Sequence, residues 1–180
     1  PDALLCAGYK WLLGPYSIGV AYFGPRFDGA EPLEETWIGR LGSEDFRGLV
    51  NYREEYQAGA ARFDVGERSN FILVPMLACA LELILEWGVD EVQAYCRRLG
   101  GDLVDEARTL GFSVETERWR AAHLFGLRAP RALDPSRTQE LLRAANVAIS
   151  LRGNALRISP HVYNTEADTA ALLDVLRALV

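Results

Sequence analysis

The stretch from Ser69 to Gly88 constrains the fold more than any other part of this sequence. It reads SNFILVPMLACALELILEWG, and residues 71–81 within it contain no charged or amide side chain. Apolar residues recur there at helical spacing, and Ser69 or Asn70 can cap the start of the helix while Gly88 ends it. A helix that is apolar on nearly every side is stable only when other elements cover it. We therefore expect this helix to be buried on most sides.

The composition is that of a globular protein with enough apolar side chains for a core, since 49% of the 180 residues are hydrophobic. No apolar run approaches the ~20 residues of a membrane span, which argues against a membrane partner. The net charge is -6 and the arginines are scattered without a basic stripe, so no nucleic-acid partner is expected. The two histidines and the lack of a Cys/His cluster argue against a metal site.

The cysteines and the first residue bear on where the protein resides. Cys6, Cys79 and Cys96 stand at wide spacings in apolar or helical contexts, which predicts reduced, buried thiols and a cytoplasmic location. The sequence starts at Pro1 without a charged leader or a cleavage pattern, so no signal peptide is predicted. We interpret this start as a cut through a longer protein.

Strands, a long loop and a second helix are predicted around the apolar run. Apolar residues at 3–7 and 17–24 predict two strands, separated by a glycine-proline turn. Residues 24–66 have few periodic apolar positions, so we expect mainly loop with a short helix near 43–50. A second helix is predicted over 89–110, where apolar side chains again follow helical spacing and a glycine comes next.

From residue 112 onward the predicted order of elements is β-β-α-β-β-α, which is that of a small α+β domain. Strands are expected at 112–116 and 122–127, followed by a helix that opens at Asp134-Pro135. The RGN sequence predicts the turn of a hairpin over 147–159. The last helix opens at Asn164-Thr165, and Asp168 completes its cap.

Lys10 is the only lysine of the chain, and the other eighteen of the 19 basic side chains are arginines. A desolvated lysine can lose its proton, attack a carbonyl carbon and form a Schiff base, whereas an arginine stays protonated. Lys10 follows an apolar strand within GYKWLLGP, and ligands of α/β sheets bind at strand ends. From the residue alone, a reactive amine and a solvated cation both remain open.

Three segments resemble the class V aminotransferase family, which are fold-type I pyridoxal-phosphate (PLP) enzymes. ALLCAGYKWLLGPYSIGVAYF is similar to the family's cofactor-lysine segment, RFDVGERSNF (62–71) to its Arg-Phe-Glu-x-Gly-Thr-x-Asn segment, and LRISPHVYNTEAD (156–168) to its C-terminal motif. The resemblance implies an α/β fold. Residues 1–87 would form the end of the large PLP-binding α/β domain, and residues 88–180 the bridging helix and a small α+β C-terminal domain.

The resemblance implies that Lys10 forms a Schiff base with PLP and moves the substrate Cα proton. Arg157 matches the arginine that binds the substrate α-carboxylate through its two-pronged guanidinium. Tyr9 stands where the family often has histidine, so it is a candidate phosphate contact, although a packing role remains open. Ala7 replaces a serine that often binds the phosphate.

Ser69 and Asn70 are further candidate cofactor contacts. In the family a threonine of this segment reaches the PLP phosphate of the neighbouring subunit, but this chain has Glu67 there, and a carboxylate repels a phosphate. The role would then pass to Ser69 or Asn70, because a helix start offers free N–H groups to an anion. A simple helix cap by either residue is the alternative.

As a whole, the resemblance implies a homodimeric transferase that acts on an amino acid and a keto acid, most simply an aminotransferase. Enzymes like isopenicillin N epimerase, kynureninase or selenocysteine lyase remain alternatives. Desulfurases carry a nucleophilic cysteine shortly before the substrate arginine, and no cysteine follows Cys96 here. The family's aspartate for the pyridine nitrogen and its stacking aromatic lie upstream of the lysine, so this segment alone is expected to be inactive. A non-catalytic dimerisation domain is the alternative from another class.

Overall fold

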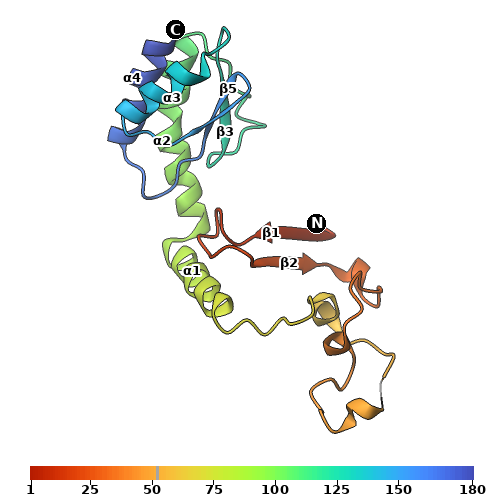
Figure 1. The fold of residues 1–180 in the computed structure, drawn as a ribbon. Coiled ribbons are helices and arrows are strands. Elements are labelled where there is room, and N and C mark those ends of the chain that lie inside the picture. Colours follow the sequence, from red (N-terminus) through yellow and green to blue (C-terminus); the bar gives the residue numbers. More distant parts are fainter. Residues whose placement is uncertain (52) are drawn as a thin grey trace. The chain divides into compact units, whose positions relative to one another are not determined.

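The computed structural model describes residues 1–51 and 53–180. The chain mixes helices and strands and divides into two compact units, Pro1–Glu86 and Trp87–Val180 (Figure 1). They are called the first unit and the second unit below. Within the described part of the chain, no helix has both the length and the apolar character needed to cross a membrane.

A two-stranded antiparallel sheet opens the first unit. Strand β1 (Ala3–Ala7) pairs with β2 (Gly19–Phe23), in a register that places Ala3 opposite Phe23 and Ala7 opposite Gly19. Both strands lie where the apolar runs predicted them. Because the two strands are antiparallel neighbours, the residues between them form one closed turn.

The long connection from residue 24 to residue 66 contains no α-helix among its described residues, which confirms the predicted loop. The short helix expected near 43–50 is present only as the 3-10 helix Gly48–Val50. Asp45 explains the difference, because its carboxylate accepts a hydrogen bond from the backbone N–H of Arg47 at 3.1 Å. Such local side-chain bonds offer the backbone an alternative to a helix.

Helix α1 (Leu73–Trp87) carries the apolar run, and the expectation that it is buried on most sides is wrong for the described residues. Of its side chains, Leu77 and Ile84 alone are buried. The β1–β2 turn covers α1 through Leu77, whose Cδ1 atom approaches Gly8 and Gly14. The large apolar side chains of α1 that remain exposed are Val74, Met76, Leu83 and Leu85.

The second unit packs three helices against a three-stranded sheet. Its elements are α2 (Val89–Thr109), β3 (Phe125–Arg128), α3 (Pro135–Ala144), β4 (Ser150–Arg152), β5 (Ala155–Ile158) and α4 (Glu166–Leu179). The strands are antiparallel in the order β3-β5-β4. The helices predicted for this part of the sequence and the hairpin around RGN are confirmed.

The prediction of a strand at 112–116 is wrong, because only Ser113 of this segment pairs with the sheet. Ser113 pairs with Arg128 through two backbone hydrogen bonds of 2.9 and 3.0 Å, and the pairing goes no further. The chain then turns, because the N–H groups of Trp119 and Arg120 donate to the carbonyl of Thr116 at 2.9 and 3.1 Å. The sheet therefore has one strand fewer than the sequence pattern predicted.

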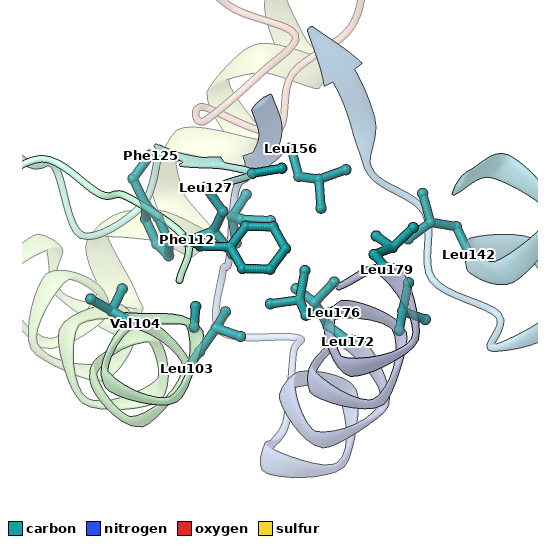
Figure 2. Packing of buried hydrophobic residues seen from close by; sticks show 14 residues of the cluster. Leu103, Val104, Phe112, Phe125, Leu127, Leu142, Leu156, Leu172, Leu176 and Leu179 are labelled. Carbon is teal, nitrogen blue, oxygen red and sulfur yellow. The ribbon is translucent and has the colours of Figure 1, made fainter. Parts of the chain in front are cut away.

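The core of the second unit lies between one face of this sheet and the helices. Leu127 of β3 and Leu156 of β5 are fully buried and point toward Leu103 of α2 and Leu176 of α4 (Figure 2). Successive residues of a strand face opposite sides, so the residues between these leucines face outward. One face of the sheet is thus buried against the helices, and the residues of the other face point away from the core.

The helix ends follow the predicted capping residues. The Asp134 carboxylate accepts the N–H of Ser136 at 2.8 Å at the start of α3. Thr165 and Asp168 form a reciprocal capping box at the start of α4, in which the Thr165 N–H donates to Asp168 at 2.8 Å. Gly88, with φ of 80°, separates α1 from α2 in a conformation that favours glycine.

Candidate active site

Lys10 lies in the turn between β1 and β2, three residues after the end of β1. The N–H of Gly8 donates to the carbonyl of Ile18 at 2.9 Å, which closes the turn beside the last strand pair. The N–H of Gly14 donates to the Gly8 carbonyl at 2.8 Å, and that of Leu13 to the Lys10 carbonyl at 2.9 Å. These bonds fix the backbone of Lys10 while its side chain stays exposed.

Two glycines let this turn pack closely on its surroundings. A Cβ atom on Gly8 would lie 2.7 Å from the carbonyl oxygen of Ile18, and one on Gly14 would lie 2.6 Å from Cδ1 of Leu77. Both distances are below 3.0 Å, which real Cβ atoms essentially never show. The lysine turn therefore sits directly on buried Leu77 of α1, and a larger residue at either glycine would displace it.

Tyr9 supports the lysine side chain. The ammonium nitrogen of Lys10 lies 4.6 Å from the centre of the Tyr9 ring, a distance at which the negative ring face attracts a cation. The other partner of this ring is Tyr16, which stacks on it at 4.3 Å with an angle of 20° between the planes. The Tyr9 ring is thus held by Tyr16 and helps to position the Lys10 amine.

The segment before α1 caps the helix. The side-chain oxygen of Asn70 accepts the N–H groups of Ile72 and Leu73 at 3.2 and 2.7 Å, which satisfies two of the free amides at the helix start. The capping alternative is therefore observed for Asn70. Ser69 is exposed, and Glu67 adopts a left-handed conformation with φ of 57°.

Arg157 lies on β5, the central strand of the sheet in the second unit, opposite Gly126 of β3 and Ser150 of β4. Its neighbours Leu156 and Ile158 are buried, so Arg157 faces away from the core and is exposed. A hollow of about 430 Å³ lies beside it. Among residues 1–51 and 53–180, no carboxylate forms an ion pair with its guanidinium, which is accessible to an anion.

The segment that follows Arg157 is fastened to α2. The Tyr95 hydroxyl donates to the Asn164 carbonyl at 2.7 Å, and the Cys96 thiol donates to the Pro160 carbonyl at 3.4 Å. Burial raises the pKa of the Cys96 thiol, so this cysteine stays protonated and serves as a structural donor. The expected buried thiol is confirmed for Cys96, but it is wrong for Cys79, which is exposed.

His161 is buried within the same segment. Its ring stacks on Tyr163 at 5.2 Å and meets Trp87 edge-on at 5.9 Å. Burial, together with the charge of His123, lowers the pKa of His161 and favours its neutral form. An imidazole packed between two aromatic rings fixes the course of the chain after β5, and this explains its burial without a catalytic role.

The structure places the candidate residues in two groups. Lys10 and Tyr9 lie together on the turn of the first unit, and Ser69 and Asn70 belong to the same unit at the start of α1. Arg157 belongs to the second unit. Within the described residues, no three His, Cys, Asp or Glu side chains gather in a way that could hold a metal ion.

Two residues beside Arg157 were not found from the sequence. Arg120 and Arg152 line the same hollow as Arg157, together with Trp119. The sequence did contain a signal for Arg152. Side chains alternate along a strand, so residues 150 and 152 lie on the same face of the hairpin as Arg157, which pairs with Ser150. Arg120 has no such signal, since it follows a turn whose geometry depends on the surrounding packing.

Comparison with known proteins gives relatives and structural neighbours along nearly the whole chain. No family model matches it. An uncharacterised aminotransferase of Bacillus subtilis (strain 168), YcbU, is 28% identical over 178 residues, which is 98% of this chain and 45% of that protein. The apo cysteine desulfurase of Thermococcus onnurineus NA1 has a TM-score of 0.77 with 22% identity, over 99% of this chain and 47% of that one.

A third similar protein is a C-DES variant with glycine covalently linked to its PLP cofactor. Its TM-score is 0.78 with 18% identity, over 97% of this chain and 45% of that chain. The predicted fold is confirmed: this is the α/β fold of the C-terminal part of the fold-type I PLP enzymes. The resemblance to class V aminotransferases and desulfurases is confirmed as well. The chain spans less than half the length of these proteins.

Proposed function

We propose that this chain supplies the lysine and the substrate arginine of a PLP-dependent enzyme that acts on amino acids, most simply a class V aminotransferase. One observation carries the proposal. The only lysine of the chain sits on a hydrogen-bonded turn after β1, with its amine exposed, in a sequence similar to an aminotransferase over 98% of its length. A cytoplasmic homodimer with domains at 1–87 and 88–180 belongs to the same proposal.

The side chains of the first unit offer groups suited to the aldehyde and the phosphate of PLP. The Lys10 amine lies on a turn that two tightly packed glycines hold in place, so it can meet an aldehyde without rearrangement of the backbone. The Tyr9 and Ser69 hydroxyls and the side-chain NH₂ of Asn70 are hydrogen-bond donors suited to a phosphate. The Asn70 oxygen is already occupied by the helix cap, so only its NH₂ would serve.

Bound PLP supplies an electron sink for the substrate Cα. The residues of this chain would then do two things. The Lys10 amine, once free, would take the Cα proton and return it, as a general base and acid. The Arg157 guanidinium would bind the α-carboxylate through two parallel N–H groups and so hold the substrate in one orientation.

The hairpin before Arg157 argues against persulfide chemistry. Strands β4 and β5 are joined by Gly153 and Asn154 alone, and Gly153 has φ of 57°, so the connection is a tight turn. It carries no cysteine, and it offers no extended loop on which a sulfur nucleophile could approach a substrate.

The proposal is tested on the protein loaded with PLP. Lys10→Ala is expected to abolish the visible absorbance of PLP bound to a lysine amine, and Arg157→Gln is expected to preserve it while weakening amino-acid binding. Arg143→Gln, an exposed arginine on α3, is the matched control and is expected to change neither. An unchanged absorbance in the Lys10 variant would refute the enzyme function.

Panels of amino acids and 2-oxo acids then decide the reaction. A transaminase converts one amino acid to its 2-oxo acid and aminates a second 2-oxo acid in return. Racemised substrate, released alanine or released sulfur or selenium would instead identify one of the other reactions that begin with loss of the Cα proton.

A further inference from the structure

The outward face of the sheet in the second unit collects positive charge. Arg157 on β5, Arg152 on β4 and Arg128 on β3 all face away from the core, since they alternate with buried or half-buried leucines. The residues opposite them are small: Gly126 and Ser150 stand across from Arg157. No bulky side chain on these strands therefore separates the arginines.

The strand register brings Arg152 close to Arg157. Arg157 is paired with Ser150, and Arg152 lies two residues further along the same face of β4. This is the diagonal position of an antiparallel pair, about 7–8 Å away and within reach of long side chains. The two guanidiniums can therefore bind neighbouring groups of one ligand.

Both side chains line the hollow of about 430 Å³, which has a third arginine in its wall, Arg120. Exposed apolar side chains, those of Trp119 and Leu124, form another part of the wall. Glu115 is the one carboxylate of the lining. The hollow thus combines cationic groups with an apolar surface, which suits a ligand that has acid groups on a short carbon chain.

The described residues of the chain do not pair with the positive charge of this hollow. Within residues 1–51 and 53–180, no ion pair or side-chain hydrogen bond involves Arg120, Arg152 or Arg157, and Glu115 forms no ion pair either. One nitrogen of Arg120, Nη1, is buried without a hydrogen-bond partner, and its guanidinium lies 5.7 Å from the Phe125 ring. Arg120 borders this hollow and also a smaller neighbouring one, which contains Glu117.

We propose that the hollow is a second anion-binding subsite, and that the substrate is a dicarboxylic amino acid or its 2-oxo acid. The substrate class rests on the proposed function, because there Arg157 holds the α-carboxylate. Arg152 binds the carboxylate of the substrate side chain, Arg120 adds charge from the wall, and Trp119 covers the methylene groups. Arg152 is then the residue that separates acidic from neutral substrates.

Binding of glutarate, measured by titration calorimetry, tests the subsite without any reaction. Glutarate is expected to bind more tightly than butyrate, its analogue with one carboxylate. Arg152→Gln is expected to lower the affinity for glutarate about 10- to 100-fold, the range for loss of a charge-assisted hydrogen bond. The affinity for butyrate is expected to stay unchanged. Arg157→Gln is expected to weaken both acids. Equal affinity of glutarate and butyrate in the unaltered protein would overturn the proposal.

Two further variants separate a direct contact from a general effect of charge. Arg128→Gln removes a guanidinium from the same sheet face but outside the hollow, and it is expected to change glutarate binding less than about twofold, within the usual effect of a screened surface charge. Arg152→Lys keeps the charge and is expected to restore part of the affinity. If Arg128→Gln and Arg152→Gln lower the affinity for glutarate equally, the effect is one of general positive charge, and the proposed subsite is overturned.

The PLP-loaded protein separates this inference from the proposed function. Changes in cofactor absorbance on addition of L-glutamate, L-aspartate and L-alanine report amino-acid binding at the cofactor. If glutarate binds through Arg152 but no amino acid changes the absorbance, the subsite stands and the proposed function fails. If L-alanine acts as well as the acidic amino acids and Arg152→Gln changes none of them, the proposed function stands and the substrate class fails.

Discussion

The two units support their candidate functional residues in different ways. In the second unit, Arg157 lies on a sheet whose opposite face packs on a continuous apolar core. In the first unit, only Leu77 and Ile84 are buried hydrophobic residues among those described, and Lys10 is fixed by backbone hydrogen bonds and by glycines without room for a side chain. The position of Arg157 therefore depends on the packing of core side chains, and the position of Lys10 depends on the geometry of the backbone.

Removal of core volume is expected to give the largest effect and the clearest contrast. Leu156→Ala deletes a fully buried side chain behind Arg157 and should lower the free energy of unfolding by about 2–5 kcal/mol. Leu85→Ala, on an exposed position of α1, should change it by less than about 0.5 kcal/mol. Urea unfolding followed by circular dichroism measures both, and equal losses would remove the distinction between the units.

A methyl group added to the lysine turn tests the backbone support. Gly14→Ala places a Cβ against Cδ1 of Leu77 and should cost about 1–3 kcal/mol, the range for overpacking, and shift the Lys10 amine. The control is Gly101→Ala in α2, where nothing lies within 4 Å and the same change should stabilise the helix by about 0.5–1 kcal/mol. Thermal unfolding and binding of PLP to the amine are the measurements; a stabilised, fully reactive Gly14 variant would contradict the packing account.

Helix caps depend on local hydrogen bonds, so their removal should lower the stability by a similar amount in both units. Asn70→Ala at α1 and Thr165→Ala at α4 each remove a side-chain acceptor of helix-start N–H groups. Each should cost about 0.5–2 kcal/mol. Chemical denaturation of the two variants gives the comparison, and a much larger loss at Asn70 would mean that this residue does more than cap α1.

The smallest expected effect is a pH dependence confined to the second unit. Burial and the charge of His123 lower the pKa of His161, so its neutral form is favoured in the folded state. The unfolded chain then binds more protons below the ordinary histidine pKa of about 6.5, and stability should fall as the pH drops from 7 toward 5. His161→Gln should flatten this slope in melting temperatures, whereas His123→Gln should reduce it only in part. An unaltered slope in the His161 variant would assign the effect to other groups.

Much of the fold follows from local patterns. The helices, the strands β1 and β2 and the hairpin of Arg157 rest on short-range periodicity, turn residues and caps, all of which are written in neighbouring residues. Lys10 was found because its chemistry is unique in the chain and because three short segments resemble one family. These signals do not depend on which elements pack together.

The remaining features depend on tertiary context. Phe112 and Val114 alternate with polar residues as a strand does, but the chain turns at Thr116 after one paired residue. The apolar run of α1 predicts burial, yet the pattern cannot say which residues cover it. The hollow beside Arg157 forms only when the strand register and the turn at residues 116–120 are combined, so Arg120 could not be assigned from the sequence.

Because the turn that carries Lys10 is exposed, proteolysis can be used to test whether the lysine amine is free. A protease specific for lysine has one cleavage site in this sequence, the bond after Lys10, and it needs a free ammonium at that side chain. The hydrogen bonds across the turn slow such a cut, and any group attached to the amine blocks it. Cleavage at a single bond thus reports occupancy of the lysine directly by mass, without reference to the colour of a cofactor or to turnover.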